Sequence, residues 1–192
     1  MPVSWFFSNF ISMKKIFLLL FVSCSIVCSM YAQDTKDTAS NHEKVTDTLK
    51  PYQKYPTLPA FNIRMMDSST IFNTYNIPAG KKTMIVFFSP DCKHCQSQIR
   101  HLTKSMDSLE NVQFYLITPV HSMTELREFY AKYHLADYKN IQVVGRDYEF
   151  FFGTFYGIKV VPDLVLYDEH KKLIKLFEGN TAISELYRYT HQ

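Results

Sequence analysis

Val86-Phe87-Phe88-Ser89-Pro90-Asp91-Cys92-Lys93-His94-Cys95 is the most informative stretch of this 192-residue chain. It ends in a Cys-x-x-Cys motif, which follows an apolar run and precedes a segment with helical patterning from Gln96 onward. Two thiols three residues apart at the start of a helix lie about one turn from each other, so a disulfide between them needs little rearrangement. This placement favours electron transfer by Cys92 and Cys95 over structural cross-linking.

The other two cysteines, Cys24 and Cys28, lie in an N-terminal stretch that is typical of an export signal. Two lysines precede an apolar core at residues 16–27, and a polar exit follows. We therefore expect residues 1–32 to be a signal peptide, and Met13 is a better start for it than Met1 because residues 1–12 carry no charge ahead of the lysines.

Two other interpretations of this N-terminal stretch stay open. Phe21-Val22-Ser23 before Cys24 loosely resembles a lipoprotein processing site, and cleavage there would leave a lipid-anchored protein. An uncleaved anchor is less favoured, because residues 16–32 are only marginally long enough for a membrane span of about 20 residues. All three interpretations predict a protein of the periplasm or cell envelope.

Removal of residues 1–32 leaves Cys92 and Cys95 as the only cysteines, and one vicinal pair builds no disulfide framework. The same removal takes away two lysines and no acidic residue, which lowers the formal net charge from +3 to +1. A net charge of +1 is too small to create the positive surface potential that binds nucleic acid.

Residues 33–55 are polar and predict a flexible tether. Residues 56–192 are long enough to form one domain with a well-buried core.

The pattern after the tether alternates strands and helices, and it ends with a hairpin around the turn at residues 168–171 and a last helix. Such an order predicts an α/β sandwich, with a mixed central sheet and helices on both faces. The strands are expected at residues 61–65, 84–88, 112–117, 141–144, 164–167 and 173–177, and the helices at residues 96–109, 122–133, 148–156 and 182–189.

Val161-Pro162 is the second chemical landmark. Proline donates no hydrogen bond to a central ladder, so we expect Pro162 just before the strand that begins at Leu164. An X-Pro bond at such a place is either cis or trans, and the residues alone leave the isomer open.

These blocks together resemble the thioredoxin superfamily and, within it, the TlpA-like exported thiol-disulfide oxidoreductases. The resemblance covers residues 59–189 and rests on three blocks in family order: Pro59-Ala60-Phe61-Asn62-Ile63, the residues 86–95 quoted above, and Tyr156-Gly157-Ile158-Lys159-Val160-Val161-Pro162 with the strand after it. It implies a thioredoxin-like three-layer sandwich. It also implies that Pro162 is cis and faces the cysteine pair, where Val161 and Pro162 shape the docking surface for a substrate cysteine.

The chain departs from the family pattern where proton-relay carboxylates are expected. Val86 stands where cytoplasmic thioredoxins carry a buried aspartate, and Gln98 where several exported relatives have a glutamate. Asp163 occupies a place where many relatives have threonine. Asp91, next to Cys92, either substitutes for the missing carboxylates or is a solvated turn residue.

The motif predicts a division of roles between the thiols. Cys92 is expected to be the exposed nucleophile, whose thiolate the helix end stabilises, and Cys95 to lie deeper and resolve the mixed disulfide. His94 is expected to tune the Cys92 pKa by a hydrogen bond or a charge. The alternative interpretation is that His94 is an exposed residue without such a role. A stabilised thiolate makes the disulfide a stronger oxidant, so we expect a pair more oxidising than that of thioredoxin.

We therefore predict an exported thiol-disulfide oxidoreductase that exchanges its disulfide with cysteines of protein partners. It is expected to act as a monomer without cofactor or metal, and a membrane-bound or soluble redox partner is expected to reset its cysteine pair.

Two alternative functions, a thiol peroxidase and a Cu(I) carrier, remain open. Ser89-Pro90-Asp91-Cys92 has the Ser/Thr-x-x-Cys spacing of peroxiredoxins, although Arg100, Arg127 and Arg146 lie in no peroxiredoxin context. A Cu(I) carrier would use both thiols and a histidine.

Overall fold

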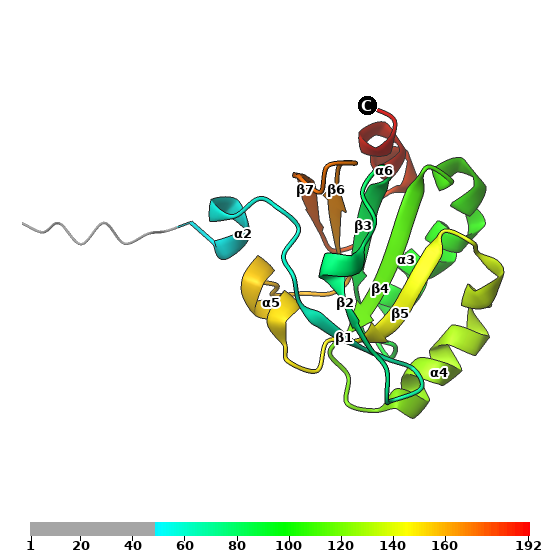
Figure 1. Cartoon of the computed structure of the whole chain (residues 1–192). Coiled ribbons are helices and arrows are strands. Elements are labelled where there is room, and N and C mark those ends of the chain that lie inside the picture. The colour runs from blue at the N-terminus through cyan, green and yellow to red at the C-terminus, as the bar shows by residue number, and fades with distance from the viewer. Residues whose placement is uncertain (1–48) are drawn as a thin grey trace, which may run out of the picture. The chain divides into compact units, whose positions relative to one another are not determined.

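The computed structural model describes residues 49–192, and within them a seven-stranded mixed sheet forms the centre of the molecule (Figure 1). The predicted signal peptide, with Cys24 and Cys28, and most of the predicted tether lie outside the described residues. The strands are β1 (Asn62–Met65), β2 (Ile71–Asn73), β3 (Lys82–Phe87), β4 (Val112–Thr118), β5 (Ile141–Arg146), β6 (Asp163–Tyr167) and β7 (Leu173–Glu178).

The strands lie in the order β2-β1-β5-β4-β3-β6-β7. Strands β3, β4 and β5 are parallel, whereas β6 pairs antiparallel with β3, β7 with β6, and β1 with β5. The predicted mixed sheet and α/β class are thereby confirmed. The carboxyl ends of the three parallel strands and the amino end of β6 meet at one edge of the sheet, and the chain's two chemical landmarks lie at this edge.

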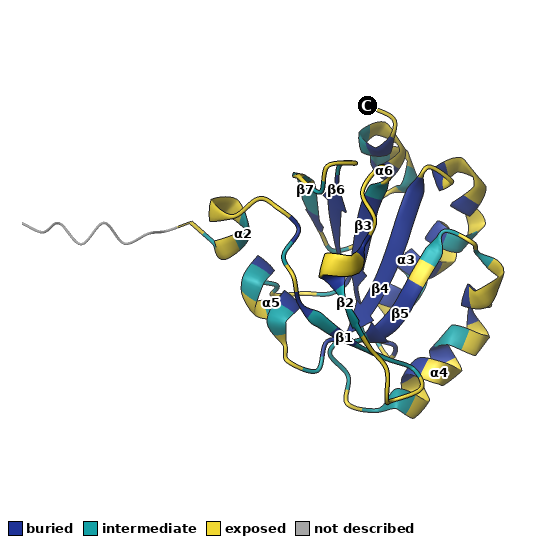
Figure 2. Ribbon diagram, viewed as in Figure 1, coloured by how far each residue is buried: buried dark blue, intermediate teal, exposed yellow. Residues whose placement is uncertain are grey.

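Helices cover both faces of the sheet. They do so because alternate side chains of each central strand are apolar and point to opposite faces, so that both faces must be buried. Met84 and Val86 point into one core cluster, and Ile85 and Phe87 into the other, so the central strands are buried on both sides (Figure 2). Helices α3 (Lys93–Lys104), α4 (Met123–Lys132) and α6 (Ile183–Thr190) pack on the first cluster, and α2 (Pro51–Lys54) and α5 (Phe151–Tyr156) on the second.

Two helix boundaries and one strand differ most from the sequence prediction. Helix α3 ends at Lys104 because Ser105 leaves the helical conformation, and the 3₁₀ helix Met106–Leu109 continues the predicted apolar face. Helix α5 begins only at Phe151, since Phe150 adopts a left-handed conformation with φ of 55°. The strand β2 was not predicted, because its three residues, Ile71-Phe72-Asn73, are too few to show an alternation of apolar and polar side chains.

The end of the segment predicted as a tether packs against the domain. Tyr52 of α2 lies over Tyr156 of α5 with 5.8 Å between ring centroids, and the Lys50 ammonium donates to the Gly157 carbonyl at 3.5 Å. In residues 49–192, no helix is both long and apolar enough to cross a membrane.

Candidate active site

The topology brings Cys92 and Pro162 to the same edge of the sheet. Phe87, the last residue of β3, pairs with Asp163, the first residue of the antiparallel strand β6. The loop that leaves β3 and the loop that enters β6 therefore meet. Residues about 70 positions apart in the sequence come together by this register alone.

Cys92 is the N-cap of helix α3. Its backbone is extended, with φ of −72° and ψ of 118°, and its sulfur accepts a hydrogen bond from the Cys95 N–H at 3.4 Å. A side chain in this position faces the free amides of the first helical turn, which favour a negative charge. The half-buried Cys92 thiol also donates to the Val161 carbonyl at 3.7 Å.

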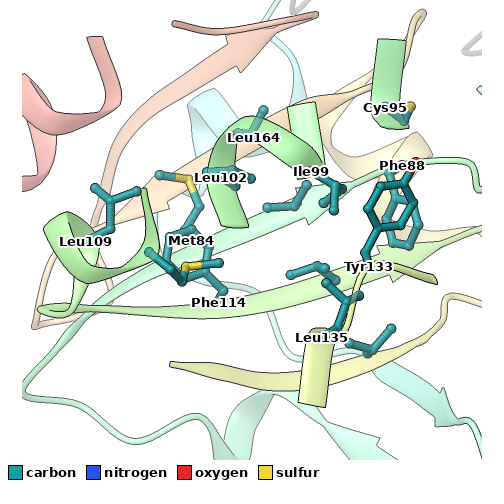
Figure 3. Close-up of a cluster of buried hydrophobic side chains, with 14 of the residues drawn as sticks. Met84, Phe88, Cys95, Ile99, Leu102, Leu109, Phe114, Tyr133, Leu135 and Leu164 are labelled. Atoms are coloured by element: carbon teal, nitrogen blue, oxygen red, sulfur yellow. The ribbon is translucent and has the colours of Figure 1, made fainter. Parts of the chain in front are cut away.

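Cys95 lies one turn deeper, on the buried side of α3. It belongs to the first core cluster with Phe88 and Ile99, as Figure 3 shows, and it has no exposed surface. Burial raises the pKa of the Cys95 thiol to about 12, although its sulfur accepts a hydrogen bond from the Ser89 N–H at 3.5 Å. No disulfide joins the two cysteines in this structure. The two thiols thus differ in exposure in the way that the motif predicts.

The Val161-Pro162 peptide bond is cis, as the family resemblance implies. Pro162 itself is buried, while the preceding Val161 is partly buried and turns its carbonyl toward Cys92. Val160 on the outer side of this loop is 57% exposed. The loop therefore places an exposed residue, Val160, close in the chain to the carbonyl that contacts the half-buried thiol.

His94 and Asp91 both lie on the exposed rim of the site. The His94 ring makes its hydrogen bond with the Asn180 side chain, at 3.5 Å between Nδ1 and Nδ2, and not with the Cys92 sulfur. The Asp91 carboxylate accepts a hydrogen bond from the Ser89 hydroxyl and is exposed, as expected of a solvated turn residue.

Gln98 has a role that the sequence did not reveal. Its buried amide donates from Nε2 to the Thr181 carbonyl at 3.1 Å, and its Oε1 accepts from the Thr181 N–H at 2.7 Å. The side chain thereby ties helix α3 to the segment that carries Asn180, the hydrogen-bond partner of His94. A charged carboxylate at position 98 would lack the donor for the Thr181 carbonyl, which explains the amide.

Asp163, which stands where many relatives have threonine, is a buried carboxyl group next to Pro162. It accepts a hydrogen bond from the Gly179 N–H at 2.9 Å, and burial raises its pKa to about 6. Neighbouring strand residues alternate between faces, and Leu164 lies in the cluster that contains Cys95. Asp163 therefore points to the opposite face of the sheet and does not adjoin the Cys95 thiol.

The residues that the two rival functions require are not gathered at this site. Arg100 contacts Tyr133, Arg127 contacts the Met66 carbonyl, and Arg146 contacts His121, so the hydrogen bonds recorded for these arginines lead away from Cys92. Within residues 49–192, no three side chains of histidine, cysteine, aspartate or glutamate form a cluster that could hold a metal ion.

The fold defines a thioredoxin-like protein. Its cysteine pair lies at a helix start and faces a cis-proline, at the edge of the sheet where β3 ends and β6 begins. The sequence agrees, because residues 75–192 match the family model of the thioredoxin-like domain, and the chain belongs to that family. No functionally curated protein matches the sequence.

Solved structures with a similar fold include proteins with redox descriptions. A secreted disulfide oxidoreductase of Mycobacterium tuberculosis aligns with a TM-score of 0.57 at 18% identity, over 68% of this chain and 94% of that protein. A thiol:disulfide interchange protein of Chlorobium tepidum gives 0.58 at 16% identity, over 70% and 93%. The reduced 2-Cys peroxiredoxin of Plasmodium vivax gives 0.55 at 20%, over 70% and 92%. At these identities the alignments describe the fold.

Proposed function

We propose that this protein is a thiol-disulfide oxidoreductase that exchanges the Cys92–Cys95 disulfide with cysteines of protein partners. The observation that carries the proposal is the unequal placement of two free thiols one helical turn apart. Cys92 caps the helix beside the cis-proline loop, where an incoming sulfur has access, while Cys95 is sealed in the core.

The exchange runs in two steps. The Cys92 thiolate attacks one sulfur of a partner disulfide, so that an S–S bond forms between the proteins and the partner's second sulfur leaves as a thiolate. Cys95 then loses its proton and attacks the Cys92 sulfur, which releases the partner's first sulfur as a thiolate. Two electrons pass from the pair to the partner, and the reverse sequence oxidises a partner dithiol.

The pKa of about 12 makes Cys95 a poor nucleophile until a base removes its proton. Its burial confines attack to the one sulfur within reach, that of Cys92, after the mixed disulfide has formed. We assign substrate docking to Val161 and Pro162, because the Val161 carbonyl already faces the Cys92 thiol. We propose that His94 tunes the pKa of the Cys92 thiol, because both residues lie at the start of helix α3.

We place this activity outside the cytoplasm, in the periplasm or cell envelope, on the strength of the signal-like residues 1–32. Its partners are protein thiols or disulfides, and a membrane-bound or soluble redox protein resets the pair.

Trapping tests the proposal. Cys95→Ser removes the resolving thiol, so mixed disulfides on Cys92 should accumulate and identify partners by mass spectrometry. The matched control is Cys92→Ser, which leaves a buried, protonated thiol and should trap nothing. If Cys95→Ser collects no adducts under conditions in which the wild type turns over, the nucleophile is wrongly assigned. Peroxide consumption that is lost in Cys92→Ser but kept in Cys95→Ser would instead favour a peroxidase.

A further inference from the structure

A small groove lies beside the nucleophile, between the active-site loop and helix α4. It has a volume of about 190 Å³, and its lining is more apolar than polar. The residues that line it are Pro90, Asp91, Glu125, Glu128, Phe129 and Lys132. One of these lining residues, Asp91, directly precedes Cys92 in the chain.

The walls of this α4 groove are held in place. The Pro90 carbonyl accepts a hydrogen bond from Gln96 Nε2 at 2.8 Å, which fixes the loop against the first turns of α3. Phe129 is buried and packs between Phe88 and Tyr133 with tilted rings, whose centroids lie 4.8 and 4.6 Å away. The floor of the groove is therefore rigid and apolar.

The rim of the α4 groove is acidic. Three carboxylates and one ammonium line it, and Lys132 is the only cation among them. Among the described residues, neither Glu125 nor Glu128 forms an ion pair, although Glu128 and Lys132 are spaced four apart on the helix. Their negative charge is thus available to a partner.

An apolar floor under an unpaired acidic rim matches the side chain of lysine or arginine, which has an aliphatic stem and a cationic head. We propose that the α4 groove binds a basic residue next to the reactive cysteine of a partner polypeptide. The proposal rests on the disulfide exchange proposed above and names its substrate class. The stem would lie on Phe129 and Pro90, and the head would face Glu125 and Glu128.

Model peptides test the proposal on the Cys95→Ser variant. Each peptide carries one cysteine activated as a disulfide with thionitrobenzoate, flanked by lysine, norleucine or glutamate. The Cys92 thiolate attacks the peptide sulfur, an S–S bond to the peptide forms, and the bond to thionitrobenzoate breaks, so that the coloured thiolate is released. We expect the lysine peptide to react about three- to tenfold faster than the norleucine peptide at low salt. A rate ratio of this size is what the attraction between exposed charges would give.

That rate ratio should fall toward one when Glu125→Gln and Glu128→Gln are added together, and high salt should also reduce it. The matched control carries Asp107→Asn and Glu110→Gln, which remove the same charge from the opposite end of β4, and should keep the ratio. Equal rates for all three peptides would overturn the proposal, as would an equal loss of the ratio in the control. Absence of release from every peptide would instead contradict the exchange function itself.

Discussion

At the scale of single residues, the two cysteines differ in burial, and their proposed roles rest on this difference. Cys92 meets solvent and the helix amides, whereas Cys95 lies wholly inside the core. The motif already predicted this order, because the first cysteine of a helix-start pair faces outward. The pKa of Cys95 depends on its neighbours in three dimensions and could be known only from the structure.

Alkylation should separate the two thiols. At about pH 8 a thiol with a pKa near 12 is ionised in only about one molecule in ten thousand, and Cys95 is also inaccessible. Iodoacetamide should therefore label Cys92 of the reduced, folded protein and leave Cys95 unlabelled, as peptide mapping would show. Unfolding in urea supplies the control, because it should allow labelling of both thiols. Rapid double labelling of the folded protein would contradict the burial of Cys95.

Asp163 should make stability depend on pH. Its folded pKa of about 6 exceeds the ordinary value of 3.8, so the folded state binds more protons between these values and loses stability as the pH rises from about 4 to about 6. Asp147, another buried carboxyl with a raised pKa, acts in the same direction. Asp163→Asn should therefore gain free energy of unfolding relative to the wild type across this range. Parallel pH curves from urea titrations would refute the assignment.

His94 should act on the redox potential rather than on folding, because its ring is exposed on the first turn of α3. If it stabilises the Cys92 thiolate, His94→Ala lowers the midpoint potential, by roughly 30 mV for each unit of thiolate pKa. Asn180→Ala removes its hydrogen-bond partner and tests whether the ring orientation matters. An unchanged midpoint potential in His94→Ala would show that His94 is a surface residue without a tuning role.

At the scale of elements, alternation and helical spacing predicted six of the seven strands and the major helices with small shifts. Local signals account for this success, such as Ser122, whose hydroxyl accepts the Glu125 N–H and caps α4 as its spacing predicted. The link between Gln98 and Thr181 could not be predicted, because the residues are 83 positions apart and neither forms a local pattern.

That link should contribute to stability. Gln98→Ala leaves the buried N–H and carbonyl of Thr181 without partners, so we expect a loss of about 1–3 kcal/mol in the free energy of unfolding. Gln142→Ala is the matched control, since its amide is exposed and bonds only to the Lys139 carbonyl. Equal, small effects of both substitutions in chemical denaturation would contradict the account of α3 and residues 179–181.

At the scale of the whole molecule, the sheet order assembles the site. Strand β6 lies antiparallel beside β3, and this pairing sets the cis-proline loop against Cys92. The family resemblance supplied that expectation, whereas periodicity alone could not order the strands. The structure added the acidic groove, in which residues of α4 meet Pro90 and Asp91 although helix α3 and strand β4 lie between them in the sequence.

The central claim is that Cys92 and Cys95 form a reversible redox couple that is more oxidising than a thioredoxin pair. The most direct measurement is equilibration of the protein in glutathione buffers, followed by acid quenching, alkylation and mass spectrometry of the cysteine peptide. The account predicts one two-electron transition with a midpoint above about −270 mV. A midpoint at or below about −270 mV, or thiols that do not interconvert with a Cys92–Cys95 disulfide, would contradict it.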